Sequence, residues 1–190
     1  MPPPNVGGVT DTTPWPPVPA ELPERHPDAP PPGTKLPMHY SGCFGCGDAH
    51  ANGLRLQLWL GEGLTVHGEF TVTEAHQGAP GLAHGGVLTA AFDEALGATV
   101  GFLLRQPAVT GRLETDFRRP VPVGSTLHIK ARHDGVTGRK VFVSAEGRLD
   151  APDGPLAVQA RALFIRVEFS HFTKHSGRGV VDPDQVDVNP

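Results

Sequence analysis

Two adjacent acidic residues, Asp93 and Glu94, lie in the middle of a long apolar stretch that contains no proline. A carboxylate among apolar neighbours costs free energy unless it is solvated, paired or used in chemistry. In one interpretation, one acid faces solvent while the other pairs with an arginine. In the other, one of the two carboxylates attacks a substrate or activates water.

The same stretch begins with His84, Gly85 and Gly86, directly after a glycine- and proline-rich loop at residues 78–81. We expect a helix over about residues 85–105, roughly 30 Å long. The first N–H groups of a helix have no partner within it, and glycines let an external oxygen approach the backbone closely. Because the helix dipole favours negative charge at this end, the motif strengthens the chemical interpretation of the acidic pair.

The strands that must position this helix are visible as runs of alternating apolar residues bounded by turns. Two runs precede the helix and four follow it, which indicates an α+β fold with an antiparallel sheet. The predicted strands span residues 54–60, 64–72, about 109–118, 126–134, 140–149 and 156–168. The helix face predicted to pack on the sheet carries Leu88, Phe92, Ala95, Thr99 and Phe102.

The composition predicts one folded domain with a tail at each end. The chain has 190 residues, of which 38% are hydrophobic and 19% charged. Thirteen of its 21 prolines lie within the first 37 residues, so we expect residues 1–35 to form a flexible proline-rich arm. The folded domain is predicted over residues 36–170, followed by a flexible acidic tail at residues 171–190.

Charge and hydropathy restrict the partners. No secretory signal and no membrane helix are visible, so we expect a cytoplasmic protein without a membrane partner. The formal net charge of −4 comes largely from the tails, and residues 36–170 are close to balance. A broad nucleic-acid-binding face is therefore not expected.

The only two cysteines, Cys43 and Cys46, form a CxxC motif. A structural zinc site needs four ligands, and no second CxxC is present, although His39 and His50 are close enough in sequence to complete one. The strand and helix expected around a thioredoxin-type redox motif are missing. We therefore favour cysteines that pack in a turn, and we expect no metal.

Three segments together resemble the hotdog-fold acyl-CoA thioesterases, in the branch similar to phenylacetate-pathway thioesterases. They are HGG with Asp93 nine residues after the histidine, the upstream CFGCG…NGLRL, and the downstream VTGRLETDFRRPVPVG. The resemblance covers roughly residues 40–166. It implies a hotdog fold, in which a sheet of five or six antiparallel strands wraps around one long helix.

The resemblance also implies roles for four residues in thioester hydrolysis. Asp93 resembles the carboxylate that attacks the thioester or activates water, and Thr110 the hydroxyl that orients this water. Gly85 resembles the oxyanion donor, supplied by a second protomer, while His84 shapes the helix start. A homodimer or a dimer of dimers is therefore expected, with active sites between protomers.

The substrate implied is an acyl-CoA, whose coenzyme is part of the substrate, and no separate cofactor is expected. Many relatives carry a polar residue where this chain has Gly78, and Gln77 or His76 are the candidates to replace it. The backbone of Gly86 is a further candidate contact. Basic residues that could meet the CoA phosphates are Arg118, Arg119, Arg139 and Lys140.

Two other functions on the same fold remain open. One is a non-catalytic acyl-CoA sensor or carrier, although no DNA-binding segment of the kind that sensors carry is visible. The other is a hydratase, which uses a different Asp/His arrangement; here no histidine follows Asp93 until His128. The sequence does not specify the acyl group.

Overall fold

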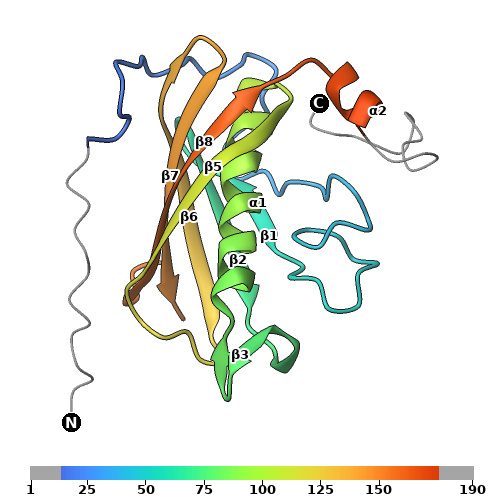
Figure 1. Ribbon diagram of the computed structural model, residues 1–190, viewed down its shortest axis with the longest axis vertical. Coiled ribbons are helices and arrows are strands. Elements are labelled where there is room, and N and C mark those ends of the chain that lie inside the picture. The colour runs from blue at the N-terminus through green and yellow to red at the C-terminus, as the bar shows by residue number, and fades with distance from the viewer. Residues whose placement is uncertain (1–13, 176–190) are drawn as a thin grey trace.

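A computed structural model describes residues 14–175 of the chain. Six antiparallel strands form one sheet in the order β1-β2-β6-β7-β8-β5, and the helix α1, Gly85–Leu104, lies along one face of it (Figure 1). The strands are β1 Gln57–Leu60, β2 Thr65–Thr71, β5 Ala108–Phe117, β6 Thr126–Thr137, β7 Lys140–Leu149 and β8 Leu156–Arg166. The predicted α+β hotdog architecture is confirmed.

The face of α1 predicted to pack on the sheet does so. Leu88, Phe92, Ala95, Thr99 and Phe102 are all buried. The sheet makes room for the largest of them at Gly147, where an added Cβ would lie 2.7 Å from the Phe92 ring. By length and composition α1 could cross a membrane, but most of it is buried inside the protein, as in the core helix of a domain. The expected cytoplasmic location stays a prediction.

Several observed elements differ from the predicted ones; β6, for example, extends to Thr137 instead of residue 134, and β8 ends at Arg166 instead of residue 168. The helix ends at Leu104, because Arg105 takes a left-handed conformation with φ 52°. Strand β1 begins at Gln57, not at residue 54, because the N–H groups of Leu54 and Leu56 donate to carbonyls of the 44–45 turn. The loop before α1 contains a short helix, η1 Glu74–His76, and a small hairpin of β3 Gln77–Ala79 and β4 Leu82–Ala83.

The described part of the predicted arm, residues 14–35, consists of bends, turns and isolated bridges, and it contacts the sheet. The Trp15 indole N–H donates to Asp134 at 3.0 Å, and its ring packs edge-on against Phe142 at 5.4 Å. Further along, Glu21 pairs through its backbone with Val136. Residues 1–13 and 176–190 lie outside the described residues, and the short helix α2, Ser170–His175, occupies the start of the predicted tail. The flexibility predicted for both tails stays a prediction.

One buried histidine links the sheet to the helix. The His133 side chain is buried in β6 and its Nε2–H donates to the Thr99 carbonyl of α1 at 3.0 Å. Its Nδ1 has no hydrogen-bond partner among the described residues. Burial lowers the pKa of His133, more than the Thr99 carbonyl and nearby Asp134 raise it. The ring is therefore neutral in the folded protein.

We expect this histidine to destabilise the protein in mild acid. Its folded pKa lies below its unfolded value, so as pH falls through about 6.5 the unfolded state takes up the proton first, costing at most about 1.4 kcal/mol per pH unit. Urea unfolding at pH 7, 6 and 5 should show this loss in the wild type and a shallower slope in His133→Gln. Equal slopes in the two proteins would contradict the assignment.

Candidate active site

The structure brings together two of the predicted catalytic residues. The Thr110 hydroxyl on β5 donates to Oδ1 of Asp93, in the middle of α1, at 2.7 Å. The pairing between β5 and β8 shifts register between Thr110 and Arg112, as at a β-bulge. Bulges re-aim side chains and are frequent beside active sites. The pair therefore holds a carboxylate and an exposed hydroxyl at one point on the molecule.

The surroundings of Asp93 suit a proton-transfer or nucleophilic role. Burial raises the pKa of Asp93, and the neighbouring charge of Glu94 acts in the same direction. The Thr110 hydrogen bond opposes this shift because it stabilises the ionised carboxylate. Asp93 is only half-buried, so water can reach it.

The start of α1 presents a free backbone donor. His84 is the N-cap, and its Nδ1 accepts the N–H of Gly86 at 2.9 Å. The N–H of Gly85 donates to no acceptor in the described part of the chain. His84 thus orders the helix start, the Gly86 donor is already occupied, and the Gly85 donor is open to an external oxygen.

The other predicted contacts near this end hold the loop before α1. The Gln77 side chain accepts from the Gly81 N–H at 2.7 Å and donates to the Glu74 carbonyl at 3.2 Å. A Cβ on Gly78 would lie 2.9 Å from the His84 backbone, so glycine allows this close approach. His76 is buried and accepts from the Thr73 N–H. Whether Gln77 or Gly78 also contacts substrate stays a prediction.

The four basic residues predicted to meet phosphates lie at two separate ends of the sheet. Arg118 and Arg119 follow β5 near the start of α1, where the Phe117 ring packs by Gly85. The Arg118 side chain is held by Gln159 and Asp116. Arg139 and Lys140 lie at the turn between β6 and β7, at the other end. One CoA-binding patch within a single protomer does not gather all four.

The adjacent acid, Glu94, points to a different group of residues. Its carboxylate lies 3.2 Å from Nδ1 of His39 and 3.5 Å from Sγ of Cys43, both in the loop that precedes β1. The two acids of the motif therefore have separate surroundings. The sequence pattern missed this cluster, because Cys43 and Glu94 are 51 residues apart in the chain; the CxxC motif was the available signal.

One large hollow lies away from these residues. A cavity of about 710 Å³ covers the sheet face opposite α1 and is lined by Trp15 and by charged strand residues such as Lys130, Glu146 and Arg161. Neither Asp93, Thr110 nor Gly85 lines it. Charged side chains of this kind are expected on a solvent-exposed face of a sheet. The Asp93–Thr110 pair is therefore the better candidate for the active site.

Known proteins resemble this chain in sequence. Residues 80–154 match the family model of the thioesterase superfamily. The matched segment contains α1 and strands β5 to β7, with Gly85, Asp93 and Thr110. Acyl-coenzyme A thioesterase THEM4 of Bos taurus is 37% identical over 92 residues, which are 48% of this chain and 37% of that protein. The chain thus spans little more than a third of the length of that curated relative.

Solved structures agree on the fold. The thioesterase superfamily protein RHA08564 has a TM-score of 0.58 and 29% identity, covering 66% of this chain and 60% of its own. The PaaI protein of the E. coli phenylacetic acid degradation operon has a TM-score of 0.56, covering 64% of this chain and 86% of its own. At 22% identity, PaaI supports the fold alone.

Proposed function

We propose that this protein hydrolyses the thioester of an acyl-coenzyme A to the free acid and CoA. The observation that carries the proposal is the Asp93–Thr110 pair, in which a partly buried carboxylate on α1 accepts a hydrogen bond of 2.7 Å from a hydroxyl on β5. The match of residues 80–154 to the thioesterase superfamily model and the likeness to an acyl-CoA thioesterase support it.

In this proposal the reaction uses two groups. The open N–H of Gly85 donates to the thioester oxygen as it gains negative charge, helped by the positive end of the helix dipole. The Asp93 carboxylate either attacks the carbonyl carbon or removes a proton from attacking water, and Thr110 orients that carboxylate or the water. If water attacks, the thiolate of CoA leaves and the free acid is formed directly. If Asp93 attacks, the thiolate leaves first and the acyl group remains on Asp93 as a mixed anhydride, which water then hydrolyses to the free acid and the regenerated carboxylate.

The two groups cannot act on one carbonyl within a single protomer. Gly85 and Asp93 are eight residues apart on α1, which separates them by about 12 Å along the helix axis. We therefore propose a homodimer in which Gly85 of one protomer faces Asp93 and Thr110 of its partner. Strand β5 carries Thr110 and forms an edge of the sheet, so it is available to pair with a second copy.

An active site shared between protomers also suggests a role for two of the four basic residues. With the active site between protomers, Arg118 and Arg119 of one chain lie near its Gly85, at the end where the carbonyl is bound. We propose these two as the first candidates for the CoA phosphates. Arg139 and Lys140 belong to the opposite end of the protomer.

The proposed function is tested by a hydrolysis screen over short, medium, long and aromatic acyl-CoAs, with Asp93→Ala as the inactive control. Turnover of one class by the wild type and its loss in the variant is the expected result. Acyl-CoA binding without turnover of any class would instead favour the non-catalytic carrier.

We expect Thr110→Val to lower turnover at neutral pH by about tenfold or more, the usual value of a hydrogen bond to a charged group. Valine keeps the shape and the strand preference of threonine. Because the lost hydrogen bond favours the carboxylate, the pKa of Asp93 should rise, moving the acidic limb of the kcat/KM profile to higher pH. Thr115→Val is the matched control, since Thr115 also lies on β5 but contacts Thr89. An unchanged profile in Thr110→Val would contradict the role.

A further inference from the structure

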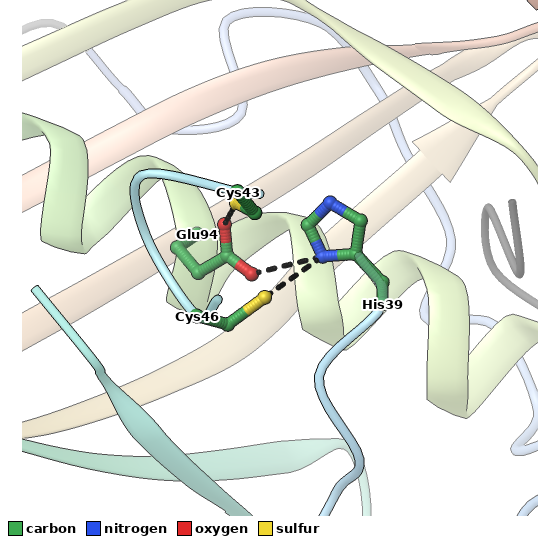
Figure 2. A group of neighbouring side chains, drawn as sticks. All are labelled: His39, Cys43, Cys46 and Glu94. Atoms are coloured by element: carbon green, nitrogen blue, oxygen red, sulfur yellow. Dashed lines mark hydrogen bonds and ion pairs between the residues drawn. The ribbon is translucent and has the colours of Figure 1, made fainter. Parts of the chain in front are cut away.

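Four side chains with metal-binding atoms converge at the side of α1. His39, Cys43 and Cys46 come from the loop before β1, and Glu94 comes from the helix (Figure 2). One ligand atom from each lies within 4.8 Å of all the others. Nδ1 of His39 is 3.1 Å from Sγ of Cys46 and 3.2 Å from Oε1 of Glu94, and Sγ of Cys43 is 3.5 Å from Oε2 of Glu94.

These separations fit the edges of a tetrahedron around zinc. Zinc bonds of about 2.0 to 2.3 Å to nitrogen, oxygen and sulfur give edges of roughly 3.3 to 3.8 Å between ligand atoms. Three of the six separations, 3.1, 3.2 and 3.5 Å, are close to this range, and the other three lie within 4.8 Å. Small side-chain adjustments therefore suffice to place all four atoms around one ion.

The loop backbone is folded tightly around this point. A Cβ on Gly45 would overlap Oε2 of Glu94, so a larger residue there would displace this carboxylate from the cluster. A Cβ on Gly47 would lie 2.2 Å from the Ser41 carbonyl, so the turn after Cys46 also requires glycine. The N–H of Gly45 donates to Sγ of Cys43 at 3.2 Å, an outer contact that stabilises a thiolate ligand.

The donor set of the cluster also suits zinc. Two cysteine sulfurs, an imidazole nitrogen and a carboxylate oxygen are all ligands that zinc takes in proteins. All four side chains are partly buried, so few water molecules can compete for the same ion.

We propose that His39, Cys43, Cys46 and Glu94 bind one structural zinc ion. All four positions of a tetrahedral site are filled by protein atoms, which is the arrangement of structural sites, not of catalytic ones. The ion fastens the loop before β1 to α1 beside Asp93. The CxxC motif alone did not predict it, because the fourth ligand comes from the helix.

The proposal replaces the expectation that the two cysteines pack in a turn without a metal, and it differs from a zinc site completed by His50. His50, the other histidine near the cysteines, lies outside the cluster, and its ring packs edge-on against Phe44 at 5.2 Å. The cysteines are free thiols in the structure, not a disulfide. The site stands independently of the proposed hydrolysis, because it uses none of the groups assigned to the reaction.

The test measures metal in the full-length protein, prepared under reducing conditions without an affinity tag that binds metal. Elemental analysis should find one zinc per chain. Cobalt in its place should give thiolate-to-metal charge-transfer absorption and the intense visible bands of a tetrahedral complex. Cys46→Ser and Glu94→Gln should each weaken zinc binding by about 100-fold or more, since each removes one of four ligands.

Two control variants make the result specific. His50→Ala changes a histidine of the same loop outside the cluster and should keep both the zinc and the cobalt spectrum. Asp93→Asn should also keep the zinc while losing turnover, so failure of the metal site and failure of the proposed reaction are distinguishable. Folded wild-type protein that takes up neither zinc nor cobalt, or forms a Cys43–Cys46 disulfide instead, would overturn the proposal. So would zinc that remains fully bound in both ligand variants.

Discussion

Asp93→Asn is expected to lower the turnover of acyl-CoA by about 10²-fold or more, the usual contribution of a positioned acid or base. The amide keeps the size of the side chain and accepts the Thr110 hydrogen bond, but it neither attacks a carbonyl nor removes a proton from water. The free energy of unfolding should not fall, because burial disfavours the ionised carboxylate. Steady-state kinetics and urea unfolding of the same preparation measure both quantities.

The adjacent acid provides the control. Glu94 faces His39 and Cys43 on another side of α1, so Glu94→Gln leaves the Asp93–Thr110 pair in place. We expect its turnover, assayed where the protein is folded, to stay far above that of Asp93→Asn. If Glu94→Gln alone abolishes activity, or Asp93→Asn stays near wild type, the assignment of the catalytic carboxylate is wrong.

The fold could be predicted from the sequence because the patterns that indicate its strands and helix are local. Alternating apolar residues locate the strands, and the spacing from Leu88 to Phe102 identifies the buried face of α1. The errors arise where tertiary contacts override the local pattern. Leu54 and Leu56 alternate as in a strand, yet their N–H groups bond to the turn at residues 44–45.

Only part of the candidate site could be predicted from the sequence. The Asp93–Thr110 pair was implied by a family resemblance, and nothing in local spacing places a β5 hydroxyl against a helix carboxylate. The contacts of Glu94 were missed because its partners are far away in the chain, in a loop without periodic structure. Long-range pairing of this kind is decided by the packing of the sheet and helix, which no local pattern encodes.

If one active site is shared between two protomers, as proposed, a substitution at Gly85 should also have a large effect on turnover. Gly85→Pro removes the open N–H and should lower turnover by about 10² to 10³, as loss of an oxyanion donor does. Gly85 is the first helical residue, after an extended N-cap with ψ 132°, a place where proline is well tolerated. Any added Cβ lies 3.2 Å from the Phe117 ring, so Gly85→Ala is the control that adds the same carbon and keeps the N–H.

Mixed dimers then decide whether the site is shared. Asp93→Asn and Gly85→Pro chains are each inactive alone, but a dimer of one of each joins an intact Asp93 to the partner's intact Gly85 N–H. Random exchange of equal amounts makes half of the dimers mixed, each with one working site of two, so activity should recover to about a quarter of wild type. Two Asp93→Asn preparations mixed in the same way should recover nothing. If the mixture shows only the summed activity of its parents although exchange is demonstrated by native mass spectrometry, Gly85 and Asp93 do not act across the protomer boundary.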